Sequence, residues 1–239
     1  MTLVFWYMDN KKIFLKHHLG LGDNIVHNGM VRKICEDFKD YQINLPSKPN
    51  NYDNVRFMYR DNPNINVVMV SNDFEMNKHI SSTKYDKIIS SYLIDQNTYD
   101  YSKYYDDAFY LQAGYDPNIK LSHFHLERDI DEENRVFKEL ILDNGIVDYI
   151  FVHEKKEDSI IINRDKIENN LPIIYADKKY KTFSLLKVIE RAKECHIISS
   201  SFLSLLMCYK LNENVYAHMY SDRSELSEYV KNNNIKVIL

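Results

Sequence analysis

Apolar residues in this chain gather in short runs that alternate with segments whose apolar positions recur at helical spacing. The run at 12–17 is followed by a turn with two glycines, and then by a segment up to Phe38 whose apolar residues lie mostly three or four positions apart. The pattern is most regular after residue 148, where several short strands precede helices. Alternation of this kind is typical of parallel sheets covered by helices, so the sequence predicts an α/β fold.

The predicted elements fall into two α/β units, residues 1–145 and 146–239, with the join near 144–148. The stretch 41–54 contains two prolines and several asparagines and therefore predicts a loop. Strands are predicted at 12–17, 55–59, 65–70, 86–90, 149–152, 159–162, 173–175, 196–199, 215–218 and 235–238. Helices are predicted at 25–38, 99–113, 131–142, 183–192, 202–209 and 224–232.

The composition narrows the class of protein. The 239 residues are 44% hydrophobic, which is enough for a real core, and carry a formal net charge of −4. A broadly basic nucleic-acid-binding protein is disfavoured, because phosphate neutralisation needs clustered Lys and Arg. No apolar run approaches the roughly 20 residues that a membrane-spanning helix needs. We therefore expect partners other than nucleic acid and no membrane span.

Cysteine usage and the first residues predict a cytoplasmic protein. Cys35, Cys195 and Cys208 are odd in number and far apart, so they resemble neither a disulfide framework nor a zinc site. The apolar run Leu3–Met8 stops at Asp9 and has no basic leader, so no signal peptide is expected. A reducing compartment is the natural interpretation.

The first candidate site is the glycine-rich turn that follows the first predicted strand, Gly20 to Asn24. Its glycines let a ligand approach the backbone, and a helix N-terminus favours negative charge. Ile25 stands where the dinucleotide fingerprint needs its third glycine, and the phosphate-loop motif is also incomplete. Asp23, at the strand ends of an open sheet, is a candidate general base. The alternative is that Asp23 or Asn24 only caps the helix.

The second candidate site is a serine run between a buried strand and a helix. Ser199, Ser200 and Ser201 directly precede Phe202, where the helix is predicted to begin. Hydroxyls and free backbone N–H groups converge at such a helix start, which suits a diphosphate. Simple capping of the helix is the alternative.

Further candidates follow other strands of the second unit. His153, Lys155 and Lys156 come directly after one strand, Arg164 follows the next, and Tyr175 ends the third. In a parallel sheet these side chains lie at the same edge, where the cationic ones can contact phosphate. The alternative for 153–156 is a solvated charged turn.

Metal binding and serine hydrolysis are disfavoured. His123, His125 and Glu127 alternate, so a strand would place them on one face, but their spacing completes no common zinc pattern. No Gly-x-Ser-x-Gly elbow is present in the sequence, which argues against a serine hydrolase. We therefore expect no metal site.

The two candidate sites together carry a family resemblance. Gly-Leu-Gly-Asp-Asn after a first strand resembles the N-terminal turn of heptosyltransferase-like glycosyltransferases of the GT-B fold. The run Ser199 to Phe202 is also similar to the Ser-Ser-Phe loop of GT-B fucosyltransferases. The resemblance implies two Rossmann-like units facing across a cleft, with the acceptor on 1–145 and the nucleotide-sugar on 146–239. It also implies that Asp23 is the catalytic base.

On this resemblance we expect transfer of a sugar from a nucleotide-sugar donor to a hydroxyl of a glycan or other acceptor. The reaction is expected to invert the anomeric centre, to need no essential metal and to use no cofactor, the nucleotide-sugar being a substrate. Contacts to the donor are expected from Gly22, Asn24, His153, Lys155, Lys156, Tyr175, Ser199, Ser200, Ser201 and Phe202. Two alternatives stay open, because fold does not fix function: a non-catalytic carbohydrate- or nucleotide-binding module on a degenerate GT-B scaffold, and a nucleotide-sugar epimerase.

Overall fold

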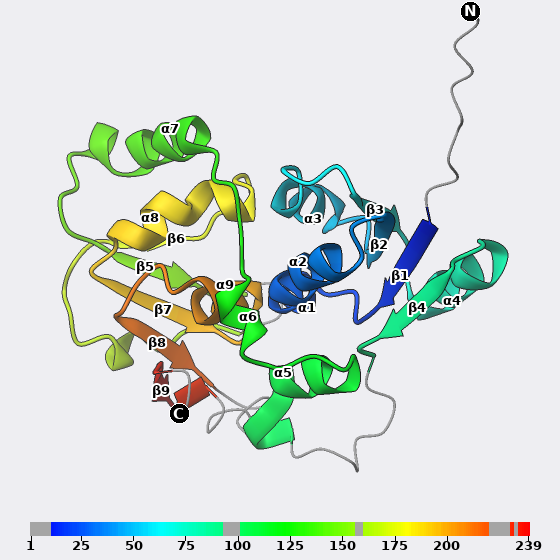
Figure 1. The fold of residues 1–239 in the computed structure, drawn as a ribbon. Coiled ribbons are helices and arrows are strands. Elements are labelled where there is room, and N and C mark those ends of the chain that lie inside the picture. The colour runs from blue at the N-terminus through cyan, green and yellow to red at the C-terminus, as the bar shows by residue number, and fades with distance from the viewer. Residues whose placement is uncertain (1–10, 93–100, 156–159, 220–229, 232–233) are drawn as a thin grey trace, which may run out of the picture.

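The protein folds around two parallel sheets, which lie side by side in Figure 1. The computed structural model describes residues 11–92, 101–155, 160–219, 230–231 and 234–239, with the side chains of 101–105 excepted. The first sheet has the strand order β3-β2-β1-β4 and the second the order β6-β5-β7-β8-β9. The predicted α/β class with two Rossmann-like units is confirmed. The strands are β1 Lys11–Lys16, β2 Tyr41–Ser47, β3 Ile65–Met69, β4 Lys87–Ser90, β5 Ile150–His153, β6 Ile173–Tyr175, β7 Glu194–Ile198, β8 Val215–His218 and β9 Lys236–Ile238.

Helices pack against both sheets and also fill the space between them, where α1, α2, α6 and α9 contact one another in pairs (Figure 1). The α-helices are α1 Leu21–Val26, α2 Asn28–Asp37, α3 Tyr52–Met58, α4 Asp73–Ser82, α5 Tyr101–Gln112, α6 Ile119–Ser122, α7 Ile130–Leu140, α8 Leu186–Arg191 and α9 Ser201–Tyr209. Short 3-10 turns lie at Leu142–Asn144, Arg164–Lys166 and Thr182–Leu185. Among the described helices, none combines the length and the apolar character that a bilayer crossing requires.

Two predictions in the first unit were wrong. The stretch 41–54, predicted as a loop, contains β2, a central strand that pairs with both β1 and β3. Pro46 lies beyond Asn44, the last residue of β2 that pairs with β1, so its missing N–H costs no ladder bond there. The strand predicted at 55–59 is the helix α3, whose Val55 and Met58 are one turn apart and buried. The helices α4 and α6 were not predicted.

One prediction in the second unit was also wrong. No strand forms at 159–162 within the described residues; Ile160 makes only an antiparallel bridge to Lys155. Residues 160–171 instead lay apolar side chains on one face of β5 and β7, where Ile162 packs against Val152 and Ile198. The helix predicted at 224–232 lies outside the described residues except for 230–231. The other strands and helices of this unit are confirmed.

One helix contributes to the cores of both units. Leu205 and Cys208 of α9 lie in the core of the N-terminal unit, whereas Phe202 of the same helix lies in the core of the C-terminal unit. Phe183 joins the first of these cores, and its ring stacks on that of Phe57 at 5.5 Å between centroids. The two units therefore share buried apolar surface along α9.

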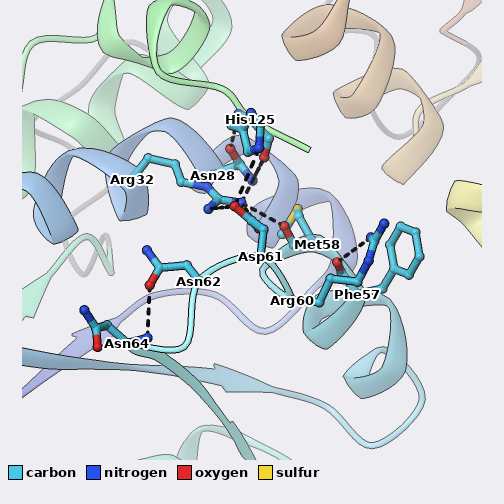
Figure 2. A network of polar contacts seen from close by, with 9 residues as sticks. All are labelled: Asn28, Arg32, Phe57, Met58, Arg60, Asp61, Asn62, Asn64 and His125. Carbon is cyan, nitrogen blue, oxygen red and sulfur yellow. Dashed lines mark hydrogen bonds and ion pairs between the residues drawn. The ribbon is translucent and has the colours of Figure 1, made fainter. Parts of the chain in front are cut away.

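The segment between α6 and α7 is fixed to α2 by a polar network (Figure 2). Asn28 and the backbone of His125 exchange two hydrogen bonds, of 3.1 and 2.9 Å. Arg32 donates to the carbonyl oxygens of Met58 and His125 and, at 2.7 and 2.8 Å, to both carboxylate oxygens of Asp61. Burial raises the pKa of Asp61, but the hydrogen bonds and the positive charge of Arg32, with smaller contributions from a backbone hydrogen bond and His125, together outweigh it and leave that pKa below its usual value. The chain that leaves α6 is thus held against the N-terminal unit before it enters α7.

A glycine sets the distance between α2 and α6. A Cβ atom placed on Gly29 would lie 2.4 Å from the carbonyl oxygen of Ile119 and 2.9 Å from that of Lys120. Both obstacles are backbone atoms, which cannot rotate away as a flexible side chain can. The absence of a side chain at Gly29 therefore permits α6 to dock.

We expect Gly29→Ala to destabilise the protein by about 1–3 kcal/mol, as overpacking of a closed interface does. Helix propensity alone predicts a more stable variant, because Ala is favoured over Gly in a helix by roughly 1 kcal/mol. The free energy of unfolding from urea denaturation decides between them. A more stable variant would show that α6 does not rest on Gly29.

Candidate active site

Each sheet has a point where neighbouring connections run in opposite directions, and open α/β sheets bind ligands at the carboxyl ends of strands there. In the first sheet the point lies between β1 and β4, and in the second between β5 and β7. His17 and Ser91 follow the first pair of strands, and His153 and Ser199 lie at the end of the second pair. His153 and Ser199 are among the donor contacts predicted from the sequence, whereas His17 and Ser91 were not predicted.

The Asp23 turn has a different cap from the one predicted. The N-cap of α1 is Gly20, so Asp23 lies inside the first helical turn, and the prediction that Asp23 or Asn24 occupies the cap was wrong. A Cβ on Gly20 would lie 2.5 Å from Oδ2 of Asp23. The half-exposed carboxylate therefore lies back over Gly20, in the space that a side chain there would take.

Asn24, predicted as a donor contact, supports the turn. Its side chain is buried, and its amide nitrogen donates to the carbonyl oxygen of Gly20 at 2.9 Å, beside the 3.1 Å bond from its backbone N–H. The two bonds tie the first turn of α1 to the residue that precedes it. Asn24 thus holds the turn that carries Asp23.

The N-terminus of α9 lies against this turn. A Cβ on Gly22 would be 2.9 Å from Oγ of Ser204 and 3.6 Å from Cα of Ser201. Ser200 is the N-cap of α9, but its hydroxyl lies 3.1 Å from Nδ1 of His153 and, within the described part of the chain, does not cap the helix. Backbone N–H groups of the first turn of α9 are therefore left to bind another acceptor.

The other predicted donor residues differ in their surroundings. His153 ends β5, and its ring lies 4.5 Å from that of Phe202, which is buried and so supports His153 rather than lining a site. Tyr175 ends β6, at the same edge, with the Arg164 guanidinium 5.2 Å from its ring. Arg164 in turn pairs with Glu154 at 2.8 Å. Lys155 forms the bridge to Ile160, and Lys156 lies outside the described residues.

The histidines behind Asp23 were missed by the sequence reasoning. The rings of His17 and His27 stack at 4.7 Å, both fully buried, and Nε2 of His27 lies 2.6 Å from Oγ of Ser91. Burial lowers the pKa of His17 to about 4 and, together with His17, holds that of His27 well below its usual value. Both rings are neutral near pH 7. The sequence did contain one signal for this pair, because a histidine lies on each side of the glycine-rich turn, His17 before it and His27 after it.

A second pair of buried histidines lies in the C-terminal unit, on the sheet face opposite α8 and α9. Nδ1 of His196 is 2.9 Å from Nε2 of His218, and Nε2 of His196 is 3.1 Å from Glu194. Burial lowers the pKa of both histidines, that of His218 to about 4. These rings are also neutral near pH 7.

The alternating histidines before α7 do not share a strand face. His123 ends α6 and faces Glu36 at 3.5 Å, while His125 faces Asp61 at 3.5 Å. Over the described ranges, no three His, Cys, Asp or Glu side chains are grouped as metal ligands. His125 belongs instead to the polar network of Figure 2.

Solved structures with this arrangement of elements include glycosyltransferases. The glycosyl transferase family 9 structure from Veillonella parvula matches with a TM-score of 0.60 and 12% identity, over 98% of this chain and 87% of that chain. The ADP-heptose LPS heptosyltransferase II of E. coli matches with a TM-score of 0.52 and 9% identity, over 95% and 90%. The fold is GT-B-like. No protein-family model and no curated protein sequence matches the chain, so the likeness lies in the fold.

We expect stability to fall as the pH drops from about 6.5 to about 4.5. A buried neutral histidine resists the proton that the unfolded chain accepts below pH 6.5, so the unfolded state binds more protons in this window. A pKa lowered from 6.5 to about 4 corresponds to about 3 kcal/mol once the pH reaches 4. Urea midpoints measured at several pH values test this.

The variant His218→Asn tests whether this histidine contributes to the dependence of stability on pH. It removes one of the buried titrating rings, so its stability should depend less on pH between 6.5 and 4.5 than that of the parent. A parent whose urea midpoint is flat across this window would contradict the prediction.

Proposed function

We propose that this chain is a glycosyltransferase that moves a sugar from a nucleotide-sugar to a hydroxyl acceptor. The observation that carries the proposal is the contact of Gly22 with Ser201 and Ser204. It brings the helical turn that carries Asp23 against the first turn of α9, a helix of the other unit. A base and an anion-binding group, adjacent but on different units, are what this transfer needs. The GT-B-like fold supports the same class of reaction.

Asp23 would act as the general base. It takes the proton of the acceptor hydroxyl while that oxygen forms a bond to the anomeric carbon. The bond from this carbon to the diphosphate breaks at the same time, and its electron pair leaves with the nucleoside diphosphate. One such displacement inverts the anomeric centre. The half-exposed position of the carboxylate supports this role, because the base must reach a substrate from solvent.

The leaving diphosphate would be stabilised at the N-terminus of α9. Ser200 is the N-cap of α9 and Ser201 its first residue, so the backbone N–H groups and the helix dipole there favour negative charge, and the hydroxyls of Ser199, Ser200 and Ser201 would add donors. Lys155 and Lys156 add positive charge after β5. Fixed donors of this kind stabilise developing charge without a metal ion, so the proposal is a metal-independent reaction with no cofactor.

The donor would be a nucleotide-sugar bound by the C-terminal unit, and the acceptor would bind to the N-terminal unit. The similarly folded E. coli protein is described as an ADP-heptose heptosyltransferase, which supports a nucleoside diphosphate sugar as the donor class. The similarity of the serine loop to fucosyltransferases stays a prediction. Tyr175 and Arg164, stacked at the same sheet edge, are further candidates for contact with the donor.

Replacing Ser200 and Ser201 together with Ala should weaken nucleotide binding about tenfold or more. A hydrogen bond to a charged group contributes about 1.5–3 kcal/mol, and about 1.4 kcal/mol is a factor of ten. Calorimetric titration with nucleoside diphosphates measures the change. The exposed adjacent pair Ser81 and Ser82 on α4 gives a matched control, whose alanine variant should bind as the parent does. Equal affinity of both variants would remove α9 from the donor site.

Asp23→Asn should lower the transfer rate by about 10²–10⁴-fold, because the amide cannot accept the proton. Stability should change little, since Gly20 and not Asp23 is the N-cap. Nucleotide affinity should persist, because the diphosphate contacts lie on α9. Transfer rate, melting temperature and nucleotide affinity are measured on the same preparation.

The matched control is Asp131→Asn, which makes the same change in the exposed first turn of α7. It should transfer at the parental rate, and an equally fast Asp23→Asn variant would show that the base lies elsewhere. Nucleotide binding by the parent without transfer would indicate the binding module. Donor conversion without an acceptor product would indicate the epimerase.

A further inference from the structure

The helix that carries Asp23 is broken by an inserted side chain. α1 ends at Val26 and α2 begins at Asn28, with His27 between them. In an uninterrupted helix the N–H of Met30 would bond directly to the carbonyl of Val26. Here Met30 N–H donates to the Tyr110 hydroxyl at 3.3 Å, and that hydroxyl donates to the Val26 carbonyl at 2.6 Å. A side chain inserted into the ladder bends a helix, so Tyr110 sets the angle between α1 and α2.

His27, at the break, reaches the backbone of Asp23 itself. Nδ1 of His27 lies 2.6 Å from the Asp23 carbonyl oxygen, which can only accept, so this nitrogen carries the proton. The neutral ring then offers a lone pair at Nε2, and the Ser91 hydroxyl donates to it at 2.6 Å. Ser91 is held in turn, because its N–H bonds to the Lys16 carbonyl at the end of β1. A continuous chain of hydrogen bonds thus runs from the sheet edge to Asp23.

The surroundings of His27 allow its ring one position. His17 stacks on it at 4.7 Å, and Phe109 and Tyr110 contact it at 5.1 and 6.5 Å between ring centroids. His17, Phe109 and Tyr110 are also buried. None of these groups touches the exposed edge where a substrate would bind, so their effect on a reaction is through Asp23.

We propose that His27 and Tyr110 are positioning residues for Asp23: Tyr110 fixes the angle of α1, and His27, anchored by Ser91, fixes the Asp23 backbone. This inference rests on the proposed function, in which Asp23 is the base. General-base catalysis needs the carboxylate within hydrogen-bond reach of the acceptor hydroxyl. An error of about 1 Å in the position of a catalytic group can cost about 10²-fold in rate.

The decisive comparison is Tyr110→Phe with Tyr149→Phe. Tyr149 is also fully buried and donates its hydroxyl to a backbone carbonyl, that of Val188, at 2.7 Å, but it lies in the C-terminal unit. Tyr149→Phe loses one buried hydrogen bond and Tyr110→Phe loses two, so both variants should melt at a reduced temperature, Tyr110→Phe the lower of the two. Only Tyr110→Phe should lower kcat, by about 10- to 100-fold, with the KM and Kd for the donor unchanged. Equal kcat in the two variants would overturn the proposal.

Ser91→Ala tests the His27 branch, with Ser47→Ala as its control. Both serines are buried at the end of a strand, but Ser47 bonds to its neighbour Lys48 rather than to a histidine. Ser91→Ala should lower kcat and Ser47→Ala should not. His27→Asn, which keeps the donor to the Asp23 carbonyl and loses the link to Ser91, should match Ser91→Ala. A kcat at the parental level in both Ser91→Ala and His27→Asn would exclude His27 as a positioning residue.

A structural readout separates this proposal from the proposed function. Amide hydrogen exchange over 21–26 should quicken in Tyr110→Phe and stay at the parental rate in Tyr149→Phe. If the parent binds nucleotide but transfers no sugar, the proposed function fails, while the exchange result still decides whether Tyr110 fixes α1. Unchanged exchange over α1 in Tyr110→Phe would overturn the positioning role.

Discussion

The close approach of α1 and α9 is the contact on which the rest of the structure depends. It is possible because Gly22 has no side chain: a Cβ there would meet the Ser204 hydroxyl at 2.9 Å. Around it, α9 buries Leu205 and Cys208 in one unit and Phe202 in the other. The two sheets are therefore joined through packed side chains, and the Asp23 turn and the serine run are brought together by the same contact. Any proposal about chemistry at this place follows from that packing.

Two buried polar side chains behind Asp23, those of Tyr110 and His27, are paired in ways that fix backbone geometry. The Tyr110 hydroxyl both accepts and donates within the break between α1 and α2, and His27 uses both ring nitrogens. Burial raises the pKa of Tyr110 well above its usual value, so the phenol keeps the proton that it donates. Polar groups in a low-dielectric interior are costly unless paired, which makes a fully paired set geometrically specific. Tyr110 and His27 hold the backbone behind Asp23 in this way.

The segment between α6 and α7 is also held by the pairing of its backbone groups. Asn28 and Arg32 of α2 satisfy the carbonyl of His125, and Arg32 also holds Asp61 beyond α3 (Figure 2). The guanidinium of Arg32 in α2 thus joins the end of α3 to the segment between α6 and α7. The chain passes from this anchor to α7, whose Val136 already packs in the C-terminal core. Because the chain is anchored at His125 and again at Val136, its path between the two points is defined.

The sequence by itself determined the α/β class and most strands, and it pointed to two candidate sites, because short apolar runs and glycine turns are local signals. It did not determine β2. Asn44 and Pro46 are residues typical of loops, and only the pairing of this segment with β1 and β3 shows that it is a strand. Nor did the sequence show that Ser200 turns to His153, that Phe202 is buried, or that Asn24 braces its own turn. The pairing of Tyr110 with Val26, 84 residues apart, was equally out of reach. Spacing along the chain fixes which face a side chain occupies, whereas its partner is decided only when distant segments pack in three dimensions.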